Sequence, residues 1–203
     1  PLVVAGEVTL PVTFALMTKD GNTAITTIAT HPHAEAQCRS YIAKHYPHAE
    51  LVATASTAAA AQSLSRGEFD AAIASSAAAE HFGLTVIADN IGDNDGAVTR
   101  FVLVGKPGQI PAPTGHDRTS VALFIDIDHA GALLEILTVF ADHNVNLTFI
   151  QSRPTGRELG HYHFIIDVEG HCQDEPVARS LDELGEICDE IRFLGSYPRE
   201  VRA

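Results

Sequence analysis

Apolar and polar residues repeat most regularly between residues 132 and 143. Apolar side chains recur there at positions i, i+4, i+7 and i+8, which together form one stripe of a helix with 3.6 residues per turn. The stripe that we predict to be buried consists of Leu133, Leu137, Phe140 and Ala141, and Glu135, Asp142 and His143 lie off it. The pattern therefore predicts an amphipathic helix that packs on one face.

The segments on either side of this helix complete a βαββαβ order. β-type runs lie at 120–126, 146–151, 161–169 and 191–197, and a second helical pattern spans 176–188. Val177, Leu181, Leu184 and Cys188 share one side of that second helix. This order of elements is the ferredoxin-like split motif, so we predict a ferredoxin-like domain in the C-terminal part of the chain.

The N-terminal half instead alternates short strand patterns with helix patterns. Strands are predicted within 1–17 and at 24–29, 50–55, 70–74, 85–88 and 98–104, and helices at 34–46, 57–67 and 75–82. The apolar run 98–104 predicts a buried strand. This alternation predicts an α/β fold with a doubly wound, mostly parallel sheet of the periplasmic-binding-like type. Such sheets bind ligands at the carboxyl ends of their strands, and residues 30–33 occupy one such end.

A segment rich in proline and glycine separates the two patterns. Residues 106–119 contain Pro107, Pro111 and Pro113 together with two glycines, and they show no hydrophobic period. That composition is typical of a linker. We therefore predict an α/β lobe at 1–105, a linker at 106–119 and a second domain at 120–203.

Charge and composition disfavour several classes of function. The formal net charge of −13 argues against nucleic acid and acidic membrane surfaces as partners, since both attract clustered Lys and Arg. No run approaches the roughly 18 apolar residues of a membrane-spanning helix. The three cysteines form no Cys-x-x-Cys pair, which predicts free thiols in a reducing compartment and hence a cytoplasmic location.

We expect neither a metal site nor a cofactor. The closest histidines, His31 with His33 and His161 with His163, form two-residue pairs that lack a third ligand at a recognisable spacing. Gly131 offers a different kind of site, because a glycine lets a second backbone come close to the start of the helix that follows. The unpaired N–H groups and the positive dipole end there suit a carboxylate, so we predict a site for a small anionic ligand.

Two short motifs of the C-terminal part resemble those of a known regulatory domain. Gly131-Ala132-Leu133 and Gln151-Ser152-Arg153-Pro154 are similar to the paired Gly-Ala-Leu and Glu-Ser-Arg-Pro signatures of the ACT domain of prephenate dehydratases. Gln151 replaces the Glu of that family, and a neutral amide still accepts and donates hydrogen bonds. The resemblance implies that L-phenylalanine binds as an allosteric effector between two ACT domains of a homodimer or homotetramer. The residues that it implicates in binding are His129, Gly131, Ala132, Leu133, Asn146, Leu147, Gln151 and Ser152.

A third motif points to catalysis. Thr99-Arg100-Phe101 resembles the Thr-Arg-Phe motif of prephenate dehydratases, which convert prephenate to phenylpyruvate in phenylalanine biosynthesis. The resemblance implies that the Thr99 hydroxyl donates a hydrogen bond to the departing ring hydroxyl and that Arg100 neutralises a substrate carboxylate. Without the resemblance, Thr99 and Phe101 are ordinary strand residues and Arg100 pairs with an acidic side chain.

A fourth stretch belongs with the same family. Thr30-His31-Pro32-His33, followed by Gln37-Cys38, resembles the family's Ser-His-Pro-Gln-x-x-x-Gln-Cys segment. The match implies that the Thr30 hydroxyl and the Gln37 amide lie in the substrate cleft. The family's glycine-rich first strand and its Glu-Asn-Ser/Thr motif do not occur in the chain, and we expect them upstream of Pro1. Residues 1–17 lack the basic segment and the small-residue cleavage site of a signal peptide.

Other functions remain open at this point. The chain could be a catalytically inactive amino-acid-binding regulatory fragment, in which the ACT domain alone acts. A solute-binding protein is suggested only by the doubly wound lobe. An ACT-bearing aromatic hydroxylase would need an iron-binding His/His/carboxylate set, which the sequence does not show.

Overall fold

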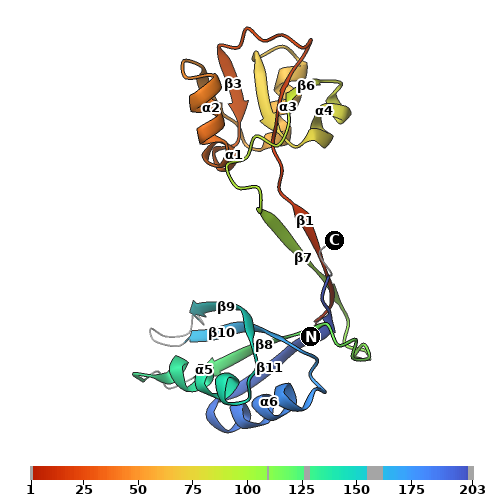
Figure 1. Cartoon of the computed structure of the whole chain (residues 1–203), viewed down its shortest axis with the longest axis vertical. Coiled ribbons are helices and arrows are strands. Elements are labelled where there is room, and N and C mark those ends of the chain that lie inside the picture. The colour runs from red at the N-terminus through yellow and green to blue at the C-terminus, as the bar shows by residue number, and fades with distance from the viewer. Residues whose placement is uncertain (1, 109, 126–128, 155–161, 201–203) are drawn as a thin grey trace. The chain divides into compact units, whose positions relative to one another are not determined.

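The computed structural model describes residues 2–108, 110–125, 129–154 and 162–200 (Figure 1). Its contacts divide the chain into two compact units, one formed by Leu10–Thr99 and the other by Pro1–Thr9 with Arg100–Ala203. The segment 106–119, predicted to be a linker, lies inside the second unit by this division. No helix in the described part of the chain is long and apolar enough to cross a membrane.

The unit 10–99 is built on a five-stranded sheet of order β4-β3-β5-β2-β6. The strands are β2 (Ala15–Thr18), β3 (Thr27–Thr30), β4 (Glu50–Ala53), β5 (Ala71–Ala74) and β6 (Thr85–Ala88). β3 runs parallel to both β4 and β5, whereas β2 is antiparallel to β5 and β6. The predicted doubly wound, mostly parallel sheet is confirmed, with β2 as the strand that reverses direction.

Helices cover both faces of this sheet (Figure 1). They are α1 (Pro32–Gln37), α2 (Arg39–His45), α3 (Thr57–Ser65) and α4 (Ser76–Phe82). Under α3 and α4 the buried layer is mostly alanine, and it consists of Ala15, Met17, Ala29, Ala60, Ala61, Leu64, Ala72, Ala74 and Ala79. The layer next to α1 and α2 uses larger side chains, among them Leu16, Ile28, Ile42 and Ile73. Each face of the sheet therefore has its own core.

The helix predicted at 34–46 is in fact two helices, which meet at Cys38. Asp93 explains the break, because it occupies groups that a continuous helix would pair internally. Its N–H donates to the Gln37 carbonyl at 2.6 Å, and its carboxylate accepts from the Ser40 N–H at 3.1 Å. The Cys38 thiol is fully buried at this joint, and burial raises its pKa to about 12. Cys38 therefore packs as a neutral apolar side chain.

The second unit contains the predicted βαββαβ domain. Its elements are β8 (Asp117–Ile125), α5 (Ala132–Asp142), β9 (Leu147–Pro154), β10 (Tyr162–Glu169), α6 (Glu175–Ile187) and β11 (Glu190–Pro198). The strands form an antiparallel sheet of order β11-β8-β10-β9. Both helices pack on one face of this sheet, over a core that includes Leu123, Phe140, Ile166 and Leu184 (Figure 1). The predicted ferredoxin-like fold is confirmed.

The predicted buried stripe of α5 is wrong by about one position. The residues that are buried are Ala132, Ile136, Val139 and Phe140, so only Phe140 belongs to both sets. Ala141 is exposed, and Leu133 and Leu137 are partly exposed. Since this helix is apolar on more than one stripe, its period shows that it packs on a face but does not show which of two neighbouring stripes is innermost.

The strand predicted at 98–104 forms, but the prediction that it is buried is wrong. β7 (Val98–Gly105) pairs with β1 (Val3–Pro11) in a two-stranded sheet. Phe101 and Leu103 are 53% and 66% exposed. The apolar run suggested burial, whereas in the described residues β7 has a sheet neighbour on one side only.

β1 also makes a close backbone contact inside the second unit. A Cβ atom at Gly195 would lie 2.1 Å from the carbonyl oxygen of Val4, and Gly195 has φ +154°. No side chain fits at that distance. Glycine at this position therefore allows the backbone of β1 to approach β11 directly.

The first testable consequence concerns Asp70, which lies just before β5. Its carboxylate accepts hydrogen bonds from the backbone N–H and hydroxyl groups of Thr26 and Thr27, at 2.6 to 3.1 Å. The side-chain hydrogen bond from Thr26 is the largest of the interactions that lower the pKa of Asp70 to about 2. Because the folded pKa lies below the unfolded one, this stabilisation is present above about pH 4 and is lost as the pH falls toward 2.

We expect Asp70→Asn to lower the free energy of unfolding by about 1 kcal/mol at pH 7, and by progressively less between pH 4 and pH 2. Urea unfolding at several pH values measures this difference. Asp20→Asn, at an exposed position of the same unit, is the control and should change little at any pH. A loss that is the same at pH 7 and pH 2.5 would contradict the assignment.

Candidate functional site

The carboxyl ends of three parallel strands form one edge of the sheet in the unit 10–99. β3 leads into α1, β4 into α3 and β5 into α4. Thr30 is the last residue of β3 and is 1% exposed. Its hydroxyl donates a hydrogen bond to the Ile73 carbonyl of β5 at 2.8 Å. Thr30 thus joins two strands at this edge, and its oxygen keeps lone pairs that can accept a further hydrogen bond.

Gln37 lies at the end of α1, next to the loop that leads into β7. Its side-chain Nε2 donates to the His33 carbonyl at 3.3 Å, and its backbone carbonyl accepts from the Asp93 N–H. Asp93 in turn holds the start of α2 through Ser40. The structure therefore attaches the loop before Thr99 to the helix that carries Gln37.

Thr99 is exposed on β7, at the end of the unit 10–99. Thr30, Gln37 and Thr99 therefore belong to one compact unit, whereas Arg100, the fourth predicted residue, belongs to the other. Successive side chains of a strand point to opposite faces. The Thr99 and Arg100 side chains are thus directed away from each other.

The Arg100 guanidinium donates in three directions. Its Nε lies 2.6 Å from Glu7 Oε2, its Nη1 lies 2.5 Å from Asp167 Oδ2, and its Nη2 lies 2.6 Å from Tyr197 Oη. Burial opposes the charge of Arg100, but these partners outweigh it and raise the pKa of the guanidinium above its ordinary value. Arg100 is therefore paired with acidic side chains of its own unit, as expected for an arginine in a strand without the family resemblance.

These partners belong to a larger group, which we name the Arg100 cluster. It consists of Glu7, Arg100, Arg118, Ser120, Asp167 and Tyr197. Arg118 donates to Glu7, and the Ser120 hydroxyl lies 2.5 Å from Asp167 Oδ1 and 2.7 Å from Tyr197 Oη. Burial raises the pKa of the Tyr197 hydroxyl, which therefore stays neutral.

The sequence does not reveal the Arg100 cluster. Its members come from five strands, and Glu7 and Tyr197 stand at opposite ends of the chain. Each of them matches an ordinary strand pattern by itself. A charged residue in an apolar strand, such as Asp167 between Ile166 and Val168, is the one local signal that could have marked the group.

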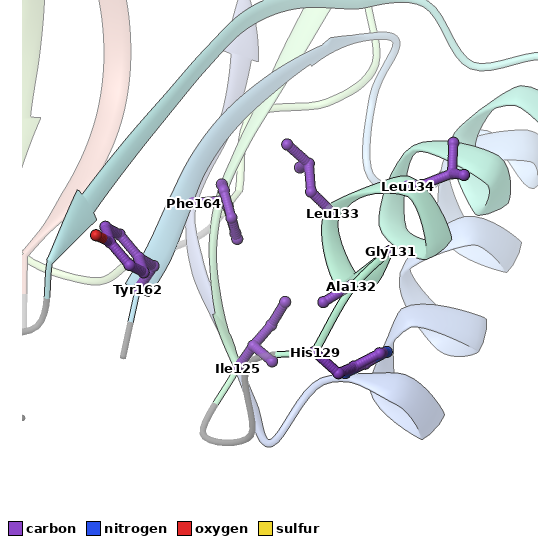
Figure 2. Close-up of a pocket in the computed structure, with 8 residues that line it drawn as sticks. All are labelled: Ile125, His129, Gly131, Ala132, Leu133, Leu134, Tyr162 and Phe164. Carbon is purple, nitrogen blue, oxygen red and sulfur yellow. The ribbon is translucent and has the colours of Figure 1, made fainter. Parts of the chain in front are cut away.

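A pocket of about 180 Å³ lies at the start of α5 and between it and the ends of β8 and β10 (Figure 2). It is lined by Ile125, His129, Gly131, Ala132, Leu133, Leu134, Tyr162 and Phe164. Four of these residues are among the predicted effector-binding set. Of the other four, Leu134 follows Leu133 on α5. Ile125, Tyr162 and Phe164 come from β8 and β10, and finding them requires the pairing of these two strands.

Gly131 is needed at this pocket for its backbone conformation. Its φ is +102°, and apart from its neighbours along the chain no described atom lies within 4 Å of the position that a Cβ would take. The expected close approach of a second backbone is therefore not made by the described residues of this chain. Beside Gly131, His129 Nε2 lies 3.1 Å from Glu135 Oε1. The positive dipole end at the start of α5 favours a bound carboxylate.

The other four predicted effector residues do not line this pocket. Asn146 donates to Glu169 Oε2 at 3.0 Å, and Leu147 packs against the core. Gln151 and Ser152 are exposed on β9, which is an edge strand of the sheet. The structure therefore separates the predicted set into a pocket group and a β9 group.

The described residues contain no cluster of three or more His, Cys, Asp or Glu side chains that could hold a metal ion. The His31 and His33 rings stack on each other with centroids 5.4 Å apart. His161 lies outside the described residues, and the His163 ring stacks on Phe124 with centroids 5.2 Å apart.

The fold and its sites define a class of protein in which a doubly wound α/β lobe is followed by a ferredoxin-like domain with a small pocket at a helix start. The sequence matches the model of the prephenate dehydratase family over residues 1–109 and that of the ACT domain over residues 120–186. The chain belongs to the prephenate dehydratase family.

Of three similar proteins, two are named prephenate dehydratase and one is described by another activity. The chain is 42% identical over 200 residues to a prephenate dehydratase of Amycolatopsis methanolica. The solved structure of prephenate dehydratase from Arthrobacter aurescens in complex with L-Phe is 48% identical, with a TM-score of 0.88 over 98% of this chain and 66% of that one. GqqA, described as a novel type of quorum quenching acylase, is 32% identical, with a TM-score of 0.86 over 98% of this chain and 73% of that one. The match covers 98% of this chain but only 66% of the Amycolatopsis protein.

The conformation of Gly131 gives a second prediction. Because its φ of +102° is unfavourable for any residue with a Cβ, we expect Gly131→Ala to lower the free energy of unfolding by about 1–2 kcal/mol. Gly185→Ala, inside α6 and with open space around the new Cβ, is the control and should leave stability equal or higher by up to about 1 kcal/mol. Chemical denaturation measures both, and equal effects of the two changes would contradict the prediction.

Proposed function

We propose that the protein to which this chain belongs is a prephenate dehydratase, which converts prephenate to phenylpyruvate, carbon dioxide and water. The observation that carries this proposal is the match of both parts of the chain, in order, to the prephenate dehydratase family and the ACT domain. The placement of Thr30, Gln37 and Thr99 in one unit supports it. We also propose a cytoplasmic location, where the free thiols of Cys38, Cys172 and Cys188 would stay reduced.

The reaction requires few functional groups of the protein. The bond between the ring and its carboxylate breaks, its electron pair enters the ring, and carbon dioxide leaves. At the opposite ring carbon the C–O bond breaks, and the departing oxygen takes a proton and leaves as water. Formation of the aromatic ring drives both steps. The protein must hold the substrate in a reactive orientation and donate a hydrogen bond to the departing oxygen.

We assign the donor role to Thr99, which is exposed and lies beside the loop held by Gln37. Gln37 and Thr30 would position the substrate, one through its amide and the other through its remaining lone pairs. The earlier prediction that Arg100 neutralises a substrate carboxylate stays a prediction, and it competes with the three hydrogen bonds that Arg100 already donates.

Replacing Thr99 tests the proposed activity. We expect Thr99→Val in the full-length protein to lower kcat by roughly 10²- to 10⁴-fold, because the departing oxygen loses its hydrogen-bond donor. Binding of L-phenylalanine should not change. Release of phenylpyruvate from prephenate measures kcat, and Thr85→Val, at an exposed threonine of β6, is the control. A Thr99→Val variant with the kcat of the unmodified protein would contradict the assignment.

We further propose that L-phenylalanine binds at the pocket on α5 and inhibits the enzyme. The pocket combines apolar walls with the start of a helix, whose positive dipole end favours a carboxylate, and this suits an apolar amino acid. Its volume of about 180 Å³ is below the roughly 300–1,000 Å³ of ordinary ligand sites. A second copy of the chain would complete it, which gives the β9 group of predicted residues a role.

The edge strand β9 supports such an assembly. Phe149 and Ile150 of β9 are 43% and 44% exposed, and an edge strand offers unpaired N–H and C=O groups to another chain. We propose a homodimer or homotetramer in which Gln151 and Ser152 of one chain approach the pocket of another. Binding of the effector and assembly would then be a single linked equilibrium.

Substituting a pocket residue tests the effector site. We expect Leu133→Gln to weaken L-phenylalanine binding by about tenfold or more, because the ligand loses an apolar wall. Isothermal titration calorimetry measures the affinity, and sedimentation at several concentrations measures assembly. Thr138→Gln, at an exposed position of the same helix, is the control. An unchanged affinity in Leu133→Gln would exclude this pocket.

Phenylpyruvate release and L-phenylalanine binding, measured on the unmodified protein, distinguish the enzyme from the main alternative. A catalytically inactive amino-acid-binding protein would bind L-phenylalanine at the pocket without releasing phenylpyruvate from prephenate. Turnover that L-phenylalanine suppresses would support the enzyme and its regulation together.

A further inference from the structure

The Arg100 cluster fixes a single side chain from several directions. The guanidinium of Arg100 is planar, and Glu7, Asp167 and Tyr197 accept from three different nitrogens of it. The side chains of Glu7 and Asp167 are only 4% and 5% exposed, whereas that of Arg100 is 28% exposed. Charges paired under so little solvent are weakly screened, and losing one partner leaves another buried without compensation.

Two partners of Arg100 are part of the ACT sheet. Asp167 lies on β10 and Tyr197 on β11, and the Ser120 hydroxyl on β8 touches both. This arrangement fixes where the Arg100 guanidinium lies relative to three neighbouring strands. The guanidinium is bound in three directions, so the Arg100 side chain ties β7 to these strands.

The same strands also form walls of the effector pocket. β8 carries Ser120 in the cluster and Ile125 at the pocket, and β10 carries Asp167 in the cluster and Tyr162 at the pocket. The two strands are neighbours, with Ser120 opposite Asp167 and Ile125 opposite Tyr162. A shift of β8 against β10 at the pocket therefore reaches the groups that hold Arg100.

We infer that Arg100 is a positioning residue that connects the ACT sheet to the strand of Thr99. Asp167 and Tyr197 hold its guanidinium, the backbone of β7 follows, and Thr99 is the adjacent residue of that strand. L-phenylalanine at the pocket changes the position of Thr99 through β8, β10 and this cluster. The inference rests on the proposed function for the roles of Thr99 and of the pocket, and it adds the residues through which the two are coupled.

The test changes the acceptors and leaves Arg100 in place. Asp167→Asn keeps the size and a hydrogen-bonding oxygen but removes the charge, and Tyr197→Phe removes one acceptor. Glu175→Gln is the control, because Glu175 forms an exposed ion pair with Arg179 on α6, away from the cluster. Each change is made in the full-length protein, and turnover of prephenate is measured with and without L-phenylalanine.

We expect both cluster variants to lose about tenfold or more in kcat while the KM for prephenate stays within about threefold. L-phenylalanine should bind them with an affinity within about threefold of the unmodified protein but should no longer suppress the remaining turnover. Arg100→Lys should behave in the same way, because a single ammonium group cannot donate to three separate acceptors at once. Glu175→Gln should keep both turnover and inhibition.

A second measurement requires no substrate. Hydrogen exchange of the β7 amides should be about tenfold faster or more in Asp167→Asn than in the unmodified chain, and unchanged in Glu175→Gln. In the unmodified chain, L-phenylalanine should alter the exchange of β7, and in Asp167→Asn it should not.

Three results would overturn the inference. Cluster variants that are fully inhibited by L-phenylalanine would show that the coupling runs elsewhere. A large rise in KM on Arg100→Lys, with Asp167→Asn unaffected, would show that Arg100 binds substrate directly. Unchanged β7 exchange in Asp167→Asn would show that the cluster does not hold the strand. Failure of the proposed function is seen separately, as an unmodified protein that neither turns over prephenate nor binds L-phenylalanine.

Discussion

One largely buried set of charges links β1 and β7 to the ACT sheet in the second unit. Glu7, Arg100, Arg118 and Asp167 contribute two negative and two positive groups, so the charges of the cluster balance, and its other members, Ser120 and Tyr197, are neutral. It lies on the side of the ACT sheet opposite the helices, and Gly195 allows β1 to approach that sheet closely. This cluster thereby joins β1 near the start of the chain, β7 in its middle and β11 near its end. The apolar core on the helix side of the sheet does not include β1 or β7.

This arrangement explains why the Thr-Arg-Phe motif combines such different residues. Thr99 is exposed, Arg100 is paired with the ACT sheet, and Phe101 is exposed on β7 of the two-stranded sheet. Neighbouring side chains of a strand contact different surroundings, because they point to opposite faces of the strand. A motif that is continuous in the sequence can therefore belong to two compact units at once.

The sequence predicts the order of elements well and the depth of burial poorly. The βαββαβ order and the doubly wound sheet follow from local periods, because helices and strands repeat their contacts every few residues. The break at Cys38, the exposure of β7 and the buried stripe of α5 depend on partners far along the chain, such as Asp93 for α1 and α2. The sites follow the same division, since the turn at Gly131 is a local signal whereas Tyr162 reaches the pocket only through strand pairing.

The layer of alanines under α3 and α4 has a further consequence for the candidate catalytic edge. Alanine has no rotamers to lose, so the alanines of this layer cost no side-chain entropy when it is ordered, and only Met17 and Leu64 do. A methyl group also has no alternative positions into which it can relax. The end of β3 at Thr30 and the starts of α3 and α4 therefore rest on a layer whose shape is set mostly by the backbone. Such a layer can hold a small substrate's surroundings rigid without contributing a single reactive atom.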